Sequence, residues 1–146
     1  SGNQYTIEFG VVLDATAPSR SPIFSRGDSY QGVTIENSKL RVYRDNSSPV
    51  DYANVAFTPN TTEIITITYD YSAGWNYINI YKNGTKIYSD VTGGSFNSWP
   101  TAKELVFGNV YTYFFKGKIK FIRFYNRVLT ASEMSNNIFV GADKAL

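Results

Sequence analysis

The chain has 146 residues, a formal net charge of +2 and 16% aromatic residues, and it contains neither cysteine nor histidine. Without cysteine there is no disulfide framework, thiol nucleophile or cysteine-ligated metal, and without histidine the commonest general base and metal ligand are missing. The small net charge argues against a nucleic-acid partner. No stretch of about 18 apolar residues occurs, so membrane insertion is not expected.

We expect one domain over residues 5–146, preceded by a tag or linker remnant at residues 1–4. A chain of this length can bury a core of its own. Because it opens with Ser1 and Gly2 instead of methionine, we expect it to be excised from a larger protein.

Apolar and polar residues alternate with a period of two along most of the chain, which predicts β-strands. Asn37-Ser38 and Asn83-Gly84 separate pairs of such segments and predict two hairpin turns, the second of type I′. The aliphatic residues are expected inside, and Thr, Asn, Lys and Tyr outside. In chain order, the predicted strands cover residues 5–13, 32–36, 40–44, 63–69, 77–82, 85–89, 105–108 and 118–125.

One short helix is predicted near residues 130–138. Thr130 and Glu133 have the spacing of a capping box, in which each residue hydrogen-bonds the backbone of the other. Met134 and Ile138 supply an apolar stripe on the same helix. The five prolines are expected to fall between strands, which leaves an all-β pattern with a single helix.

The end of the chain carries the most distinctive pattern. Residues 115–119 read FKGKI, and residues 122–133 read IRFYNRVLTASE. Earlier segments that belong to the same pattern are YTIEF at 5–9, IFSRGD at 23–28, IENSKLRVY at 35–43, ITYD at 67–70, IYKNG at 80–84 and LVFGN at 105–109.

In this order, over residues 5–140, these segments resemble the laminin-G-like, concanavalin A-like jelly-roll lectin–glucanase superfamily. The resemblance implies an all-β fold, a two-sheet antiparallel β-sandwich of the concanavalin A-like jelly-roll type. It implies function only coarsely, because this fold serves sugar binding, adhesion, accessory domains of enzymes and virion parts.

The chain departs from the family pattern at two places. The family carries an earlier strand with an aromatic–Asp–Gly pattern, which is not found ahead of residue 5. Phe139-Val140, another segment or another chain would then fill that sheet edge. In addition, Gly10 follows Phe9 where the family tends to have a large residue, which thins the surface at that position.

Catalysis is not expected. Catalytic members of the wider concanavalin A-like group hydrolyse glycans with two carboxylates on one strand, spaced as Glu-x-Asp-x-x-Glu. This chain has no Glu-x-Asp pair, and Glu133 belongs to the helix cap. No cofactor or metal is expected either. For a calcium ion, Asp70 and Asn109 would be the candidate ligands.

A sugar presents apolar CH faces and a rim of hydroxyls, so its site needs exposed aromatic rings with amide side chains nearby. Trp75 and Trp99 fall in predicted loops, where the alternative is that each covers the end of the core. The stripe on the non-core face of strand 77–82 could instead be a cross-strand packing ladder. The candidate ligand-binding residues are Trp75, Trp99, Tyr77, Asn79, Tyr81, Asn109, Tyr111 and Tyr113.

Lys116, Lys118 and Lys120 alternate, and Arg123 and Arg127 follow. The three lysines share one strand face, which could bind acidic glycans or nucleic acid. Alternatively, lysines on an edge strand prevent pairing with another chain. The mildly basic composition favours this second interpretation.

We therefore predict a non-catalytic recognition module that binds carbohydrate through aromatic and amide side chains. The expected location is extracellular, on a cell surface or on a virion, as part of a larger protein that gains avidity by repeating the module or by forming a homo-oligomer. The expected partner is a glycan or a cell-surface or virion protein. Two alternatives stay open: a structural or adhesion domain, such as a virion decoration or fibre domain, and an accessory domain of a glycan-active enzyme.

Overall fold

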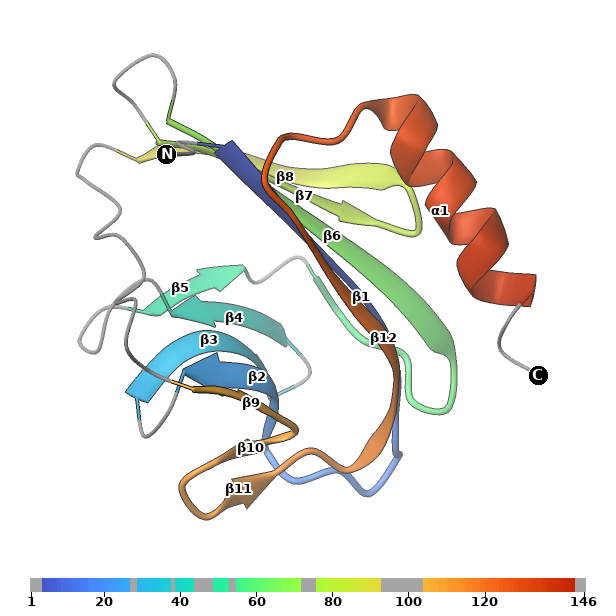
Figure 1. Cartoon of the computed structure of the whole chain (residues 1–146). Coiled ribbons are helices and arrows are strands. Elements are labelled where there is room, and N and C mark those ends of the chain that lie inside the picture. Colours follow the sequence, from blue (N-terminus) through green and yellow to red (C-terminus); the bar gives the residue numbers. More distant parts are fainter. Residues whose placement is uncertain are drawn as a thin grey trace. The chain divides into compact units, whose positions relative to one another are not determined.

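The computed structural model describes residues 4–26, 29–37, 39–43, 49–52, 55–71, 76–92 and 104–143. Within these ranges the chain is built from strands and one helix (Figure 1). Every strand pair whose register is described is antiparallel. The elements are β1 (Gln4–Leu13), β2 (Arg20–Arg26), β3 (Ser29–Glu36), β4 (Lys39–Tyr43), β5 (Pro49–Tyr52), β6 (Thr62–Asp70), β7 (Asn76–Lys82), β8 (Thr85–Thr92), β9 (Leu105–Phe107), β10 (Asn109–Val110), β11 (Tyr113–Phe114), β12 (Gly117–Tyr125) and α1 (Ala131–Asp143).

These elements form two compact units. The first contains β1, β6, β7, β8, most of β12 and helix α1, with a five-stranded sheet in the order β12-β1-β6-β7-β8. The second contains β2 to β5 and β9 to β11, with a five-stranded sheet in the order β5-β4-β3-β2-β9 and the small β10-β11 pair. Each unit is described by itself below.

One face of the first sheet carries an aliphatic core. Ile7 on β1 pairs with Ile67 on β6, which pairs in turn with Ile80 on β7. Cross-strand partners share a face, so the period of two in three neighbouring strands brings their apolar side chains together. The fully buried members are Ile7, Phe9, Ile65, Ile67, Ile78 and Ile80.

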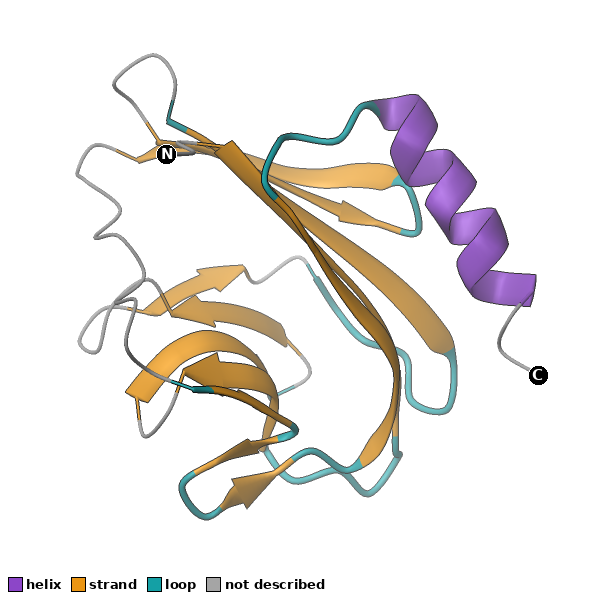
Figure 2. Cartoon of the chain, in the orientation of Figure 1, coloured by secondary structure: helices purple, strands orange, loops and turns teal. Residues whose placement is uncertain are grey.

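The opposite face of β1 and β6 is polar and is also buried, whereas the sequence pattern predicts that threonines stay outside. Thr6, Glu8, Thr66 and Thr68 are all nearly inaccessible. The loop that runs from β12 into α1, drawn in teal in Figure 2, is attached to this face by hydrogen bonds to Thr6. The Thr6 hydroxyl accepts a hydrogen bond from the Leu129 amide and donates one to the Arg127 carbonyl, at 3.1 and 2.8 Å. The loop replaces water as the hydrogen-bonding partner, so burial leaves this hydroxyl satisfied.

The predicted β7–β8 turn is confirmed. Asn83 and Gly84 have φ values of 49° and 80°, as both central residues of a type I′ turn require. The Asn83 side-chain oxygen accepts a hydrogen bond of 2.8 Å from the Ile64 amide, which ties the turn to β6.

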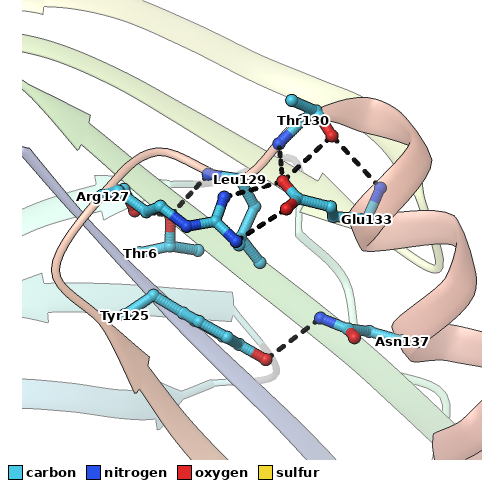
Figure 3. Close-up of polar contacts among 7 residues, drawn as sticks. All are labelled: Thr6, Tyr125, Arg127, Leu129, Thr130, Glu133 and Asn137. Atoms are coloured by element: carbon cyan, nitrogen blue, oxygen red, sulfur yellow. Dashed lines mark hydrogen bonds and ion pairs between the residues drawn. The ribbon is translucent and has the colours of Figure 1, made fainter.

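The predicted capping box is also confirmed (Figure 3). The Glu133 amide donates to the Thr130 hydroxyl at 3.3 Å, and the Thr130 amide donates to the Glu133 carboxylate at 2.9 Å. The helix continues to Asp143, past the predicted end at residue 138. Phe139 and Val140 are therefore part of the helix, and the suggestion that they fill a sheet edge is wrong. No proline interrupts the helix at these positions, so it continues through them.

The second sheet contains two strands that the sequence pattern did not predict, β2 and β5. Both contain a proline, Pro22 in β2 and Pro49 at the start of β5, so the expectation that prolines fall between strands is wrong here. Pro22 lies beside a register shift in the β2–β3 pairing, and Pro49 begins an edge strand. These are the places where a sheet tolerates a missing N–H. The buried core of this sheet is Ile23, Phe24, Val33, Ile35, Leu40 and Val42.

In the part of the chain that the structure describes, no helix has both the length and the hydropathy of a membrane span.

Candidate functional site: the aromatic hairpin

Strands β10 and β11 form a tight hairpin in the second unit, and residues 109–114 are called the aromatic hairpin here. Asn109 pairs with Phe114 and Val110 with Tyr113, which leaves Tyr111 and Thr112 as a two-residue turn. Tyr111 has a φ of 53°, a left-handed conformation that is uncommon for a residue with a side chain.

Exposed apolar side chains concentrate in this part of the chain. Tyr111 is 54% exposed and Phe114 is 61% exposed. Monomeric proteins rarely expose contiguous apolar surface without a function for it, so this concentration marks a candidate recognition surface. The large hydrophobic residues exposed along residues 105–114 are Leu105, Phe107, Tyr111, Tyr113 and Phe114.

The hairpin is attached to strand β2 at one end by hydrogen bonds. The Ser25 hydroxyl donates to the Asn109 carbonyl, and the Gly108 amide donates to the Ile23 carbonyl, both at 2.9 Å. Val110, on the same strand as Asn109, is buried. A two-stranded hairpin is marginal on its own, so these attachments determine where its side chains lie.

At its other end, the hairpin contacts an ionic network on β2, β3 and β4. The Arg20 guanidinium lies over the Tyr113 ring, 4.8 Å from its centroid. Arg20 also donates two hydrogen bonds of 3.1 Å to Glu36, which accepts a third of 2.8 Å from Arg41. Planar bidentate pairing of this kind fixes the orientation of the guanidinium plane.

The two faces of the hairpin differ. Val110 and Tyr113 share one face, on which Val110 is buried and Tyr113 contacts Arg20. Asn109 and Phe114 share the other face, where the amide of a half-buried asparagine stands directly across the ladder from an exposed phenyl ring. An exposed ring next to an amide is the combination that a sugar site requires.

The stripe on β7 lies in the first unit and is mostly engaged within the sheet. The Asn79 carbonyl oxygen accepts from the Ser89 hydroxyl at 2.9 Å, and its amide nitrogen donates to Thr68 at 3.4 Å. Tyr81 is half-buried, and burial raises the pKa of its phenol. Tyr77 is exposed, opposite Val91. For Asn79 and Tyr81, the hydrogen bonds and the burial fit the cross-strand packing ladder, which is the alternative to a ligand-binding role for this stripe.

The structure thus brings three of the predicted residues together on the hairpin, namely Asn109, Tyr111 and Tyr113. Trp75 and Trp99 lie outside the described residues and stay predictions. Asp70 is half-buried on β6, opposite Tyr77. Among the described residues, no group of three or more acidic, histidine or cysteine side chains is placed to hold a metal ion.

Sequence reasoning missed Phe114 and Arg20. Alternation would have paired Phe114 with Asn109 if the turn had been recognised, but Tyr111-Thr112 has neither the glycine nor the asparagine that signals such turns. No local signal connects Arg20 to Tyr113, because the contact depends on the packing of the hairpin against β2.

Two of the basic residues after residue 115 are paired with carboxylates of the fold. Arg123 is paired with Glu8 at 3.0 Å and Arg127 with Glu133 at 2.6 Å. Strand β12, which carries Lys118 and Lys120, is at an edge of its sheet. This position fits the interpretation that the lysines protect an edge strand.

The family pattern predicts that Gly10 thins the surface beside Phe9, and this prediction is wrong. A Cβ at Gly10 would lie 2.6 Å from Cε1 of Phe121, so the Phe121 ring already occupies the space of the missing side chain. On that ring lies the Arg123 guanidinium, 4.2 Å from the centroid. The Phe121 ring comes from β12, which is far from β1 in the sequence but next to it in the sheet, and it takes the place of the large residue that the family has at this position.

Three solved structures share this fold at low sequence identity. Domain 4 of a GH43 extracellular arabinanase from Geobacillus stearothermophilus, in complex with arabinotriose, has a TM-score of 0.68 and 18% identity and covers 93% of this chain and 66% of its own. The CBM40 of the Ruminococcus gnavus IT-sialidase, bound to α2,3-sialyllactose, has a TM-score of 0.70 and 14% identity over 94% of this chain and 84% of its own.

The third is a structure of botulinum neurotoxin type C, a toxin that depends on interaction with two ganglioside molecules to get into cells. It has a TM-score of 0.65 and 12% identity, and the match covers 95% of this chain and 36% of the toxin chain. This chain therefore spans less than two thirds of the arabinanase domain and of the toxin. Comparison with curated protein sequences gives no match.

The family model described as the concanavalin A-like lectin/glucanases superfamily matches residues 1–135. The antiparallel sheets, the one helix among the described residues and the confirmed capping box agree with the all-β sandwich that this family has. The chain belongs to the concanavalin A-like lectin/glucanases superfamily.

Proposed function

We propose that this chain is a non-catalytic carbohydrate-binding module, and that the Asn109–Phe114 face of the aromatic hairpin contacts the sugar. The observation that carries the proposal is the pairing itself: a phenyl ring that is 61% exposed stands across the ladder from an amide, on a hairpin attached to β2. The apolar CH face of a sugar stacks on Phe114, and the Asn109 amide can both donate to and accept from neighbouring hydroxyls.

Four glutamates among the described residues support a non-catalytic role, because each is held in an ion pair within the fold. Glu8 is paired with Arg123, Glu36 with two arginines and Glu63 with Lys82. Glu133 belongs to the helix cap. A retaining or inverting glycosidase needs two carboxyl groups that face one substrate bond, one of them able to donate a proton.

Similar folds support the ligand class and the location. The arabinanase domain is in complex with arabinotriose and the sialidase module is bound to α2,3-sialyllactose, and the arabinanase is extracellular. We carry both over to this chain as part of the proposal: an oligosaccharide ligand, and a place outside the cell within a larger protein.

The experiment is a glycan array that includes arabinotriose and α2,3-sialyllactose, followed by calorimetric titration of each glycan that binds. Phe114→Ala and Asn109→Ala are each expected to weaken binding by roughly tenfold, because truncating an important contact residue costs more than about 1 kcal/mol. Phe124→Ala is the matched control, since Phe124 is an exposed ring of similar accessibility on β12 in the other unit. Equal effects of Phe114→Ala and Phe124→Ala would contradict the proposal.

Trp75→Ala, Trp99→Ala and Tyr77→Ala form a second arm of the same titration. Binding that depends on one of these residues and not on Phe114 would place the site elsewhere and overturn the assignment to the hairpin.

The second candidate function is protein interaction or adhesion. Exposed Leu105 and Phe107 on β9, next to the hairpin in the chain, are the observation that favours it, because exposed aliphatic and phenyl side chains suit a protein partner. An array on which no glycan binds would favour this role over the first.

A further inference from the structure

We propose that Arg20 is a positioning residue for the aromatic hairpin. It packs on the Tyr113 ring, a contact called the clamp here, and so holds the opposite face, which carries Asn109 and Phe114, in the geometry that binds the ligand. The inference rests on the proposed function only for its ligand readout, since the clamp itself can be tested without any ligand.

The first step in the argument is the way in which Arg20 is held. It lies on β2 directly across from Glu36 on β3, and two parallel hydrogen bonds of 3.1 Å join them. Glu36 is held in turn by Arg41 on β4. The guanidinium plane is therefore fixed by a chain of charges over three strands before it meets the hairpin.

The second step is the contact with the ring. The Arg20 guanidinium carbon is 4.8 Å from the Tyr113 centroid, within the range of a cation–π interaction. Tyr113 and Phe114 are consecutive strand residues and point to opposite sides of the hairpin. Fixing the Tyr113 ring on one side therefore fixes the plane from which the Phe114 ring projects on the other.

The third step is that the hairpin needs this contact. Its strands have two residues each, and the described hydrogen bonds from β2 reach it at one end, through Asn109 and Gly108. Tyr113 is next to the turn, at the end farther from these bonds. Without Arg20 the turn end can fray, and a surface that must order itself on binding loses affinity.

The decisive comparison is between Arg20→Ala and Arg41→Ala. Each variant removes one arginine from Glu36, but Arg20 is the one stacked on Tyr113. Amide hydrogen exchange is measured at Tyr113, which pairs with Val110 next to the turn, at the end that Arg20 contacts. Arg20→Ala is expected to speed this exchange by about two- to fivefold, the range of an exposed cation–π contact. Arg41→Ala is expected to speed it less, because the two hydrogen bonds between Arg20 and Glu36 and the contact with Tyr113 remain.

Equal exchange rates in the two variants would overturn the clamp. A second readout uses arabinotriose and α2,3-sialyllactose as probes: Tyr113→Ala is expected to weaken binding, and the conservative Tyr113→Phe, which keeps a ring over the guanidinium, to recover it. No recovery in Tyr113→Phe would also count against the clamp. If exchange separates the two arginine variants while Phe114→Ala leaves glycan binding intact, the clamp stands and the proposed function fails.

Discussion

Glu8 is an acidic residue with a fully buried side chain, and the residues around it are arranged to compensate its charge. Arg123 donates to one carboxylate oxygen at 3.0 Å, and the Thr66 hydroxyl lies 3.4 Å from the other. The Arg123 guanidinium also covers the Phe121 ring, which fills the space above Gly10. Five residues from three strands thus form one stack, in which each depends on its neighbours.

The first prediction concerns the charge in this stack. Arg123→Ala is expected to destabilise the chain by about 3 kcal/mol, because it leaves a buried carboxylate without its cation. Adding Glu8→Gln to that variant is expected to restore part of the loss, since a neutral amide is less costly to bury. Urea unfolding of the two single variants and the double variant measures this coupling. Additive effects would show that the two side chains do not interact.

The second prediction concerns the ring. Gly10→Ala puts a methyl group 2.6 Å from Cε1 of Phe121, so the ring must move, at a cost of about 1–3 kcal/mol. In a Phe121→Ala background the same change is expected to cost little, because the space is empty. Thermal unfolding of both pairs tests this. A full cost in the Phe121→Ala background would mean that the backbone, not the ring, resists the methyl group.

The sequence alone could not predict this stack. The family comparison indicates that a large side chain is missing at Gly10, but the ring that replaces it comes from a strand more than a hundred residues later. The same limit applies to Arg20 and Tyr113. Alternation shows which face of a strand a residue occupies, but lateral neighbours depend on strand order, which short-range patterns do not encode.

At the scale of single elements, helix α1 has a start that is sensitive to pH. Hydrogen bonds from Arg127, and then from the Thr130 backbone and side chain, lower the pKa of Glu133 to about 2 from an ordinary value of 4.5. A carboxyl group whose pKa is lowered by folding stabilises the fold when the pH is above the pKa that the group has in the unfolded state. That stabilisation is lost as the pH falls through the folded-state value.

The third prediction follows from this sign. As the pH falls from 4.5 toward 2, the contribution of the cap to stability is expected to disappear. In Glu133→Gln this part of the pH dependence should be absent, while stability at neutral pH should be lower than that of the unsubstituted chain. Thermal midpoints across this pH range measure the effect. Parallel curves for both proteins would exclude Glu133 as its source.

Elements whose signals are local could be predicted from the sequence, and others could not. The β7–β8 turn and the capping box are each encoded by two residues that require a given backbone. Strand β2 was missed because Pro22 argues against a strand until the neighbouring register shift is known. The two-residue turn at Tyr111 was missed because a tyrosine with positive φ has no local signal and is maintained by the surrounding packing.

At the scale of the whole molecule, family membership and the described sheets agree with the predicted all-β sandwich. For the site, sequence reasoning could name Asn109, Tyr111 and Tyr113 of the hairpin but could not rank them above the β7 stripe. The ranking depends on exposure and on hydrogen bonds already made, as at Asn79, and both are properties of the folded chain.

The fourth prediction concerns valency. A site built from one hairpin face offers little enclosed surface, so a single copy is expected to bind weakly. A tetramer of the chain on a glycan-coated sensor is expected to show an apparent affinity higher by about 100-fold or more, because later contacts become intramolecular. Biolayer interferometry of the monomer and the tetramer tests this. A tetramer carrying Phe114→Ala should lose the gain, and if it keeps the gain, the hairpin is not the point of contact.

The placement of the hairpin also makes this chain a candidate scaffold for selecting new binders. The side chains that face outward, at positions 109, 111, 112 and 114, lie within one short stretch of codons, whereas Arg20 and Glu36, which hold the frame, are encoded far upstream. A combinatorial library confined to that stretch would vary the ligand that the protein binds and leave Arg20 and Glu36 unchanged.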